Sequence, residues 1–272
     1  MSHFSTRRFL PWAALVSFAL LFLFYFQRTC YEVPVLMYHH VGYSPEPSSV
    51  YVTPENFEAQ MEFLKVHRYR VMELSEVIRR VRSGQAFPRK TVSLTFDDGY
   101  ADNLVNAFPV LKKMSFPATI FMISSNAGRE GWLSEEDLRI LDGSAVTIGS
   151  HTAHHAFLPE LAAADAKTEI ADSKDALEKI LGHPVTLFSY PAGGTTPAIE
   201  KWVEQAGYEG AVTTNYGKER SNPYALHRIK VSGGSGNLFN FWFKTGGYYS
   251  LGKKRVEAVI SETRTEGARD DE

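Results

Sequence analysis

The sequence predicts an α/β fold in which parallel strands and crossover helices close into a barrel. From about residue 32 onward, short apolar runs alternate with amphipathic segments, which is typical of repeated β-α units. Seven or eight such repeats favour closure over an open sheet. At 272 residues, 44% of them hydrophobic, the chain can bury one large core, and barrels of this length commonly form a single domain.

Each element is predicted by a local signal. Strands are expected at the apolar runs 35–38, 70–72, 92–96, 118–123, 146–149, 186–190, 211–213 and 227–231. Helices are expected at 54–66, 74–83, 103–114, 135–141, 162–181 and 197–206. Thr53 is the predicted N-cap of the first helix, and Ser134 with Asp137 resembles a capping box before the fourth. A closing helix is expected within 232–252, where many aromatic residues would cap the barrel or else contact substrate or a membrane surface.

The N-terminal segment predicts a membrane anchor. Residues 9–26 carry no charged side chain, and a helix of this length spans about 27 Å, close to one bilayer core. No small-residue cleavage site follows, so we expect a signal-anchor that is not removed. Arg7 and Arg8 precede the segment and only Arg28 follows it, which predicts an extracytoplasmic catalytic domain, periplasmic or extracellular.

The expected organisation follows from these segments. It is a cytoplasmic tail at 1–8, a transmembrane signal-anchor at 9–26, a linker at 27–33, a catalytic domain at 34–251 and a charged tail at 252–272. The net charge of -2 argues against nucleic acid as a partner. The single cysteine, Cys30, excludes an intrachain disulfide.

Polar side chains follow several predicted strands. Asp97 and Asp98 follow the run at 92–96, and three histidines, His151, His154 and His155, follow the run at 146–149. Active sites of (β/α) barrels lie at the carboxyl ends of the strands, so we expect these groups to meet there. One carboxylate and two imidazoles make a three-ligand site for a divalent metal, with the second carboxylate left to act as a base.

The residue types leave two questions open. His151 could pair with either His154 or His155, since both spacings bring two rings to one side. The two-histidine, one-carboxylate set also suits Fe(II) oxygenases, although the β-α alternation argues against that class.

Three motifs resemble those of the polysaccharide deacetylase family, also called the NodB-homology family or carbohydrate esterase family 4. TFDDG at 95–99 is similar to the first motif, HTAHH at 151–155 to the second, and FSYPAG at 188–193 to a variant of the third. The similarity covers roughly residues 34–231. It implies a distorted (β/α)7-type barrel that hydrolyses N-acetyl or O-acetyl groups of a sugar polymer.

The resemblance also implies roles by position. Asp97 would be the general base, and Asp98, His151 and His155 would hold the metal, with zinc expected first and cobalt or nickel as substitutes. The main-chain N–H of Ala192 would help to stabilise the oxyanion.

Two features depart from the family pattern. The arginine that usually orients the base is Ser189 in this chain, and we expect Arg228, in the last strand, to replace it. The late histidine that serves as general acid has no clean match, which leaves His227 as the candidate. Four further residues are expected to line the substrate pocket: His39 (beside His40), Trp132, Tyr190 and Pro191.

The sequence therefore predicts a metal-dependent hydrolase that removes acetyl groups, most of all N-acetyl groups, from a cell-envelope or extracellular polysaccharide. Two alternatives stay open: an amidohydrolase of the same fold acting on a non-sugar amide, and a membrane-tethered glycan-binding protein without turnover. The expected partners are the acetylated polymer and the membrane.

Overall fold

The computed structural model describes residues 17–18, 31–44, 46, 48–214, 222–233 and 237–249. The chain divides into two compact units, Met1–Glu32 and Val33–Glu272, and the fold below is that of the second. Among the described residues, no helix combines the length and the apolar character needed to cross a bilayer. The predicted anchor at 9–26 lies outside the described residues apart from 17–18, as does the predicted tail at 252–272.

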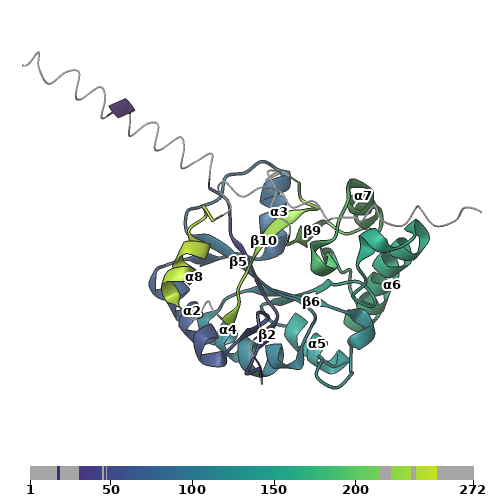
Figure 1. Ribbon diagram of the computed structural model, residues 1–272, viewed down its shortest axis with the longest axis horizontal. Helices are drawn as coiled ribbons and strands as arrows, with labels where there is room; N and C mark the ends of the chain where they lie inside the picture. Colours follow the sequence, from purple (N-terminus) through teal and green to yellow (C-terminus); the bar gives the residue numbers. More distant parts are fainter. Residues whose placement is uncertain are drawn as a thin grey trace, which may run out of the picture. The chain divides into compact units, whose positions relative to one another are not determined.

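Seven parallel strands close into a barrel, as the sequence predicts (Figure 1). The ring closes because β1 pairs with β5 on one side and with β10 on the other. Around the ring the strands are β1 (Val35–Tyr38), β10 (Leu226–Lys230), β9 (Gly210–Thr213), β8 (Leu187–Ser189), β7 (Val146–Ser150), β6 (Ala118–Met122) and β5 (Thr91–Phe96). The predicted strand at 70–72 is β4 (Arg70–Val71), which pairs with β5 outside the ring.

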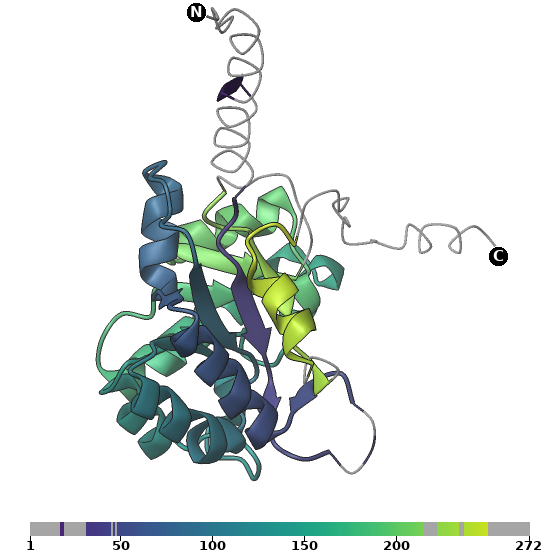
Figure 2. The same ribbon diagram turned by 90° about the vertical axis from the view of Figure 1, so that its left-hand side faces the viewer.

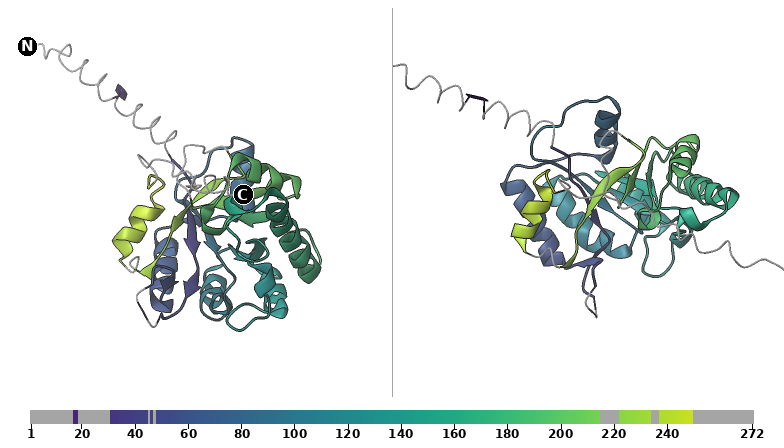
Figure 3. Two further views of the ribbon diagram at one scale, coloured as in Figure 1. Left: turned by 45° about the vertical axis from the view of Figure 1, so that its right-hand side comes forward. Right: turned by 45° about the horizontal axis from the view of Figure 1, so that its top comes forward.

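Helices surround the strands and cover their outer faces (Figures 1 and 3). They are α2 (Pro54–Val66), α3 (Leu74–Arg82), α4 (Phe108–Met114), α5 (Glu135–Asp142), α6 (Ala163–Leu181), α7 (Pro197–Gln205) and α8 (Leu238–Thr245). The predicted caps are confirmed. Thr53 Oγ1 accepts from the Asn56 N–H at 3.3 Å, and Ser134 and Asp137 form a reciprocal capping box at the start of α5.

The segment after β5 differs from the prediction. A continuous helix was expected over 103–114, but residues Asn103–Ala107 form a wider π-helical turn before α4 begins. The side-chain amides of Asn103 and Asn106 donate to the carbonyls of His39 and Val41, at 2.8 and 2.7 Å. The turn therefore anchors the backbone that follows β1, and wide turns of this kind are frequent at functional sites.

A small parallel ribbon was not predicted. It consists of β2 (His40–Val41) and β3 (Tyr51–Val52). Two residues are too few to show an alternating pattern, so the sequence carries no signal for these strands.

Candidate metal and catalytic site

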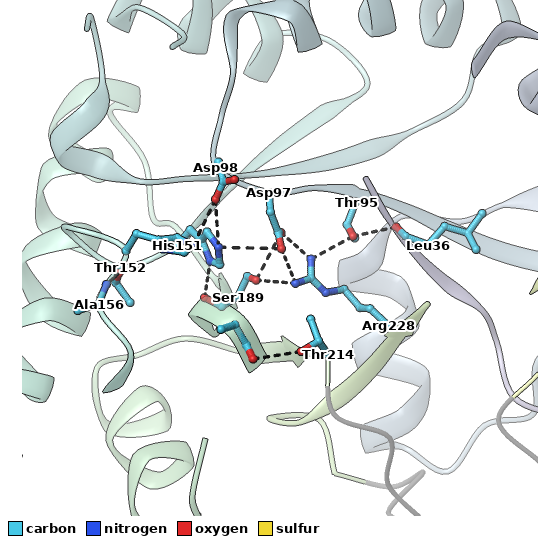
Figure 4. A network of polar contacts seen from close by, with 12 residues as sticks. Leu36, Thr95, Asp97, Asp98, His151, Thr152, Ala156, Ser189, Thr214 and Arg228 are labelled. Carbon is cyan, nitrogen blue, oxygen red and sulfur yellow. Dashed lines mark hydrogen bonds and ion pairs between the residues drawn. The ribbon is translucent and has the colours of Figure 1, made fainter. Parts of the chain in front are cut away.

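The carboxyl ends of four barrel strands bring polar side chains together (Figure 4). Asp97 and Asp98 follow β5, His151 follows β7, Ser189 ends β8, and Arg228 lies within β10. The predicted grouping of strand-end residues is confirmed for this cluster. These residues lie far apart in the sequence, and closure of the barrel brings them together.

Three side chains form a possible metal site. Ligand atoms of Asp98, His151 and His155 lie within 4.8 Å of one another. Asp98 Oδ1 is 3.5 Å from His151 Nε2 and 3.4 Å from His155 Nε2. This oxygen is buried and receives no hydrogen bond from any described residue. A buried oxygen without a donor beside two imidazole nitrogens fits a divalent cation, which would satisfy all three groups.

His151 is oriented as a metal-binding histidine would be. Its Nδ1 lies 2.8 Å from the carbonyl oxygen of Ser189, which can only accept, so Nδ1 carries the proton and Nε2 presents a lone pair towards Asp98. Burial lowers the pKa of His151, partly offset by Asp97 and Asp98, so the neutral form is favoured. No sequence signal predicts this contact, because it is made by a main-chain atom.

His154 is held away from this cluster. Its Nδ1 lies 2.7 Å from Glu169 Oε1, its backbone N–H donates to Oε2 of the same residue, and its side chain is 68% exposed. The geometry thus groups His155, and not His154, with His151.

Arg228 binds the second carboxylate in a bidentate pair. Its Nη1 and Nη2 lie 2.6 Å from Asp97 Oδ1 and Oδ2, respectively. Nη2 also donates to Ser189 Oγ at 2.9 Å, and that hydroxyl is 3.4 Å from Asp97 Oδ1. The expectation that Arg228 lies against Asp97 is confirmed, and Ser189 occupies the space beside it.

The pair determines the charge of Asp97. Burial by itself would raise the pKa of this carboxyl, but the charges of Arg228 and His151 and the hydrogen bonds from Arg228 outweigh it, so the pKa lies well below its usual value. Asp97 is only 3% exposed. Asp97 is therefore a buried carboxylate that stays ionised. It lies next to the possible metal site but is bound by the Arg228 guanidinium.

His39 is close enough to the carboxylates for their charges to affect it. It follows β1, it is half-buried, and its Nδ1 is a buried atom that receives or makes no hydrogen bond with the described residues. Burial lowers the pKa of His39, and the charges of Asp97 and Asp98 offset part of this shift. Its neighbour His40 is instead bound to Asp102, at 2.6 Å, and stacks between Tyr51 and Tyr100.

The turn after β8 has an unusual backbone. Ala192 has φ 50° and ψ 17°, in the left-handed region, and Gly193 has φ 73°. Thr213 Oγ1 donates to the carbonyl of Gly193 at 2.9 Å, and Thr214 Oγ1 donates to that of Ala192 at 3.3 Å. A non-glycine residue in this conformation is strained by about 1 kcal/mol, and such strain is concentrated at functional sites.

The other predicted residues lie in different surroundings. Trp132 is partly buried, 5.7 Å from the ring of Tyr100, and its Nε1 has no described partner. Tyr190 is fully buried, packs on Phe188 and donates to the Tyr224 carbonyl at 2.9 Å, so the structure does not bring its ring to the cluster.

Pro191 and His227 complete the predicted set. Pro191 is buried in the turn that carries Ala192. His227 precedes Arg228 in β10, and since neighbouring residues of a strand point to opposite faces, it faces away from Asp97.

Known proteins share this sequence and fold. A family model described as "Polysaccharide deacetylase" matches residues 84–211. A Bacillus subtilis (strain 168) protein named "Putative polysaccharide deacetylase YxkH" is 35% identical over 217 residues, which cover 79% of this chain and 77% of that protein. The chain belongs to the polysaccharide deacetylase family. The resemblance predicted from the three motifs is thereby confirmed, and this family member is a hydrolase.

Two further relatives extend the comparison. A poly-beta-1,6-N-acetyl-D-glucosamine N-deacetylase of Staphylococcus aureus is 29% identical over 210 residues and covers 70% of each chain. The structure of Streptococcus pyogenes deacetylase PplD in complex with acetate matches with a TM-score of 0.71 and 28% identity, covering 77% of this deacetylase and 97% of PplD.

Proposed function

We propose that this deacetylase is a metal-dependent hydrolase that removes N-acetyl groups from a β-1,6-linked N-acetylglucosamine polymer. The single observation that carries the metal dependence is the cluster of Asp98, His151 and His155, whose ligand atoms lie within 4.8 Å of one another. The substrate class is taken from the Staphylococcus aureus relative. Zinc suits one carboxylate with two imidazoles, and cobalt or nickel could replace it.

The site divides the chemistry between groups on different strands. A cation held by Asp98, His151 and His155 would polarise the acetyl carbonyl and acidify water. Asp97 accepts the proton of the attacking water. Because Arg228 binds both of its oxygens and lowers its pKa, Asp97 is ionised at neutral pH and its orientation is fixed. The main-chain N–H of Ala192 donates to the oxyanion that develops on the carbonyl.

The leaving amine needs a proton, and we assign His39, in its imidazolium form, to supply it and return to neutral imidazole. The charges of Asp97 and Asp98 act on its ring, and its ring nitrogen Nδ1 makes no hydrogen bond among the described residues. His227, the candidate from the sequence, lies on the opposite face of β10 from Arg228. Acetate and a free amine on the sugar are the products.

Acetate release tests the proposed reaction. The full-length protein is incubated with β-1,6-linked and with β-1,4-linked N-acetylglucosamine oligomers, before and after treatment with a chelator. We expect release from the β-1,6 oligomer, loss of it after chelation, and recovery when zinc is added. Asp97→Asn should lower release by about 10²–10⁴-fold while keeping the metal bound. Turnover that survives complete metal removal would contradict the proposal.

We also propose that the N-terminal segment at 9–26 anchors the enzyme in a membrane with the barrel on the extracytoplasmic side. The support is the uncharged run and the two arginines before it. External protease applied to intact cells should digest the barrel, whereas digestion only after lysis would contradict this orientation.

A further inference from the structure

His39 lies at a junction between two sheets. Strand β1 ends at Tyr38 and the ribbon strand β2 begins at His40, so His39 belongs to neither strand. In Figure 2 the purple strand β1 runs downwards, and the chain continues from its lower end into the ribbon. Since His39 takes no place in either ladder, its direction depends on the other contacts of its backbone.

The main chain brings His39 beside the proposed base. Tyr38 of β1 pairs with Phe96 of β5, and the Asp97 N–H donates to the Tyr38 carbonyl at 2.9 Å. His39 and Asp97 are thus the next residues beyond the last pair of two parallel strands. The charge of Asp97 acts on the His39 ring. A change in the backbone at His39 would therefore change where its ring lies relative to the base.

The side-chain amide of Asn103 holds this backbone. Its Nδ2 donates to the His39 carbonyl at 2.8 Å and to Asp102 Oδ1 at 2.9 Å. A carbonyl and a carboxylate can only accept, so the amide nitrogen, and not the amide oxygen, must point towards them. Asn103 is 1% exposed, so water cannot replace it as the donor to His39.

The amide oxygen shows that Asn103 does more than fill space. Asn103 Oδ1 is buried and receives no hydrogen bond from any described residue. A buried acceptor without a partner costs free energy, and an aliphatic side chain of similar size would avoid that cost. The donor to the His39 carbonyl is a contact that only the polar side chain can provide.

A second asparagine in the same turn offers a comparison. Asn106 Nδ2 donates to the Val41 carbonyl at 2.7 Å, a bond of the same kind two residues further along the chain. His40 lies between the two bonds, and it is fixed separately by a carboxylate at 2.6 Å and by a stacked ring on each face. Loss of the bond from Asn106 should therefore not displace His39.

We propose that Asn103 is a positioning residue for the proton donor: its amide fixes the main chain at His39 and so directs the imidazole towards the leaving nitrogen. This inference rests on the role proposed above for His39. Asn103 follows Asp97 and Asp98 in one short segment of the chain. That segment therefore supplies the base, a metal ligand and the support of the acid, which keeps their relative positions fixed.

A double-mutant cycle tests the proposal. The full-length parent, Asn103→Ala, His39→Asn and the double variant are compared for kcat on the β-1,6-linked oligomer. We expect Asn103→Ala to lower kcat by about 10- to 100-fold, since a displacement of about 1 Å can cost that much. The double variant should be no slower than His39→Asn alone, because Asn103 acts through His39. If the two losses multiply, Asn103 acts elsewhere and the proposal is wrong.

The leaving group provides a second criterion. Asn103→Ala should keep the KM for the oligomer and the kcat for an activated acetate ester, whose leaving group needs no proton. The matched control, Asn106→Ala, should keep the parent's ratio of amide to ester turnover. Equal losses on both substrates in Asn103→Ala, or the same change of ratio in Asn106→Ala, contradict the proposal. Asn103→Leu, which fills the buried space, takes the place of Asn103→Ala if that variant does not fold.

Nuclear magnetic resonance separates this inference from the proposed function. The nine histidines are labelled with ¹⁵N in the full-length chain in detergent, and the ring signals lost in His39→Asn identify His39. We expect Asn103→Ala to shift these signals and Asn106→Ala to leave them unchanged. If the parent releases no acetate from any oligomer, the proposed function fails, and the ring signals still test the contact. Unchanged His39 signals in Asn103→Ala overturn the inference whatever the activity.

Discussion

At the residue scale, the bidentate pair between Arg228 and Asp97 is the contact that most affects both chemistry and stability. Both side chains are buried, at 0 and 4% exposure, so solvent cannot replace either partner. The guanidinium also lies 5.5 Å from the centre of the Phe121 ring and donates to Thr95 Oγ1. A buried carboxylate that lost this partner would be left uncompensated.

We predict that Arg228→Met lowers the free energy of unfolding by about 3–5 kcal/mol at pH 7 and greatly reduces turnover. In the parent, the folded-state pKa of Asp97 lies below the usual 3.8, so the pair stabilises the protein above that pH and its contribution is lost as the pH falls through the folded-state pKa. In the variant, burial raises the pKa, so the difference between the two proteins should shrink below about pH 4. Urea unfolding at several pH values measures it.

The control for this prediction is Arg139→Met. Arg139 forms an exposed pair with Glu135 within α5, and loss of such a pair changes stability by less than about 1 kcal/mol. If both variants lose the same free energy of unfolding, the buried pair stabilises the protein no more than an exposed pair does.

The assignment of His39 makes a prediction that depends on the leaving group. His39→Asn should lower turnover of an N-acetylglucosamine oligomer by about 10²-fold or more, because the amine must be protonated as it leaves. The same variant should lose far less turnover of an activated acetate ester, because the leaving group of that substrate needs no proton. The comparison of kcat for the two substrates checks this. His227→Asn should change neither, and equal losses on amide and ester with His39→Asn would refute the proton-donor role.

At the element scale, the turn after β8 is held in a conformation that only certain residues tolerate. A Cβ on Gly193 would lie 2.1 Å from Thr214 Oγ1 and 2.9 Å from the Thr214 nitrogen, and its φ of +73° is itself unfavourable for other residues. Any side chain at this position must move the turn, and the N–H of Ala192 moves with it.

We predict opposite results for two neighbouring substitutions in this turn. Gly193→Ala should lower kcat by about 10²-fold or more, since displacing one oxyanion donor costs about that much. Ala192→Gly keeps the N–H and relieves the left-handed strain, so it should retain activity and raise the free energy of unfolding by up to about 1 kcal/mol. Kinetics and urea unfolding of both variants provide the test, and a fully active Gly193→Ala would show that the turn plays no part in catalysis.

At the scale of the whole molecule, a metal bound by residues of the loops after β5 and β7 should couple the site to global stability. A ligand that binds only the folded state at 100 times its dissociation constant adds about 2.7 kcal/mol. For a barrel of this size that corresponds to a rise in Tm of roughly 5–10 °C. We predict that zinc raises Tm by this amount in calorimetry and that chelation reverses it.

Two variants distinguish the site from incidental metal binding. Asp98→Asn should abolish the rise in Tm, because the central carboxylate loses its charge. Glu169→Gln, which alters the partner of His154 outside the cluster, should keep it. A rise that survives Asp98→Asn would place the metal elsewhere.

Most of the architecture was predictable because strong local patterns carry it. All eight predicted strands are present within two residues of their expected ends, and α2 begins and ends where its cap and its periodicity indicate. The pairing of Arg228 with Asp97 was predictable from a chemical need, since a base without its usual arginine requires another cation. Contacts made by main-chain atoms could not be predicted from the sequence, such as the hydrogen bond between His151 Nδ1 and the Ser189 carbonyl oxygen. The two-residue strands β2 and β3 are too short to give a sequence pattern.

The last barrel strand to be synthesised, β10, both completes the ring against β1 and brings Arg228 to Asp97. The same strand therefore closes the barrel and positions the side chain that orients the proposed base. During synthesis, a chain that ends at residue 220 already contains Asp97 and the three proposed metal ligands. It still lacks Arg228, which binds Asp97. A chain without β10 would therefore lack both the closed ring and the guanidinium that aligns Asp97.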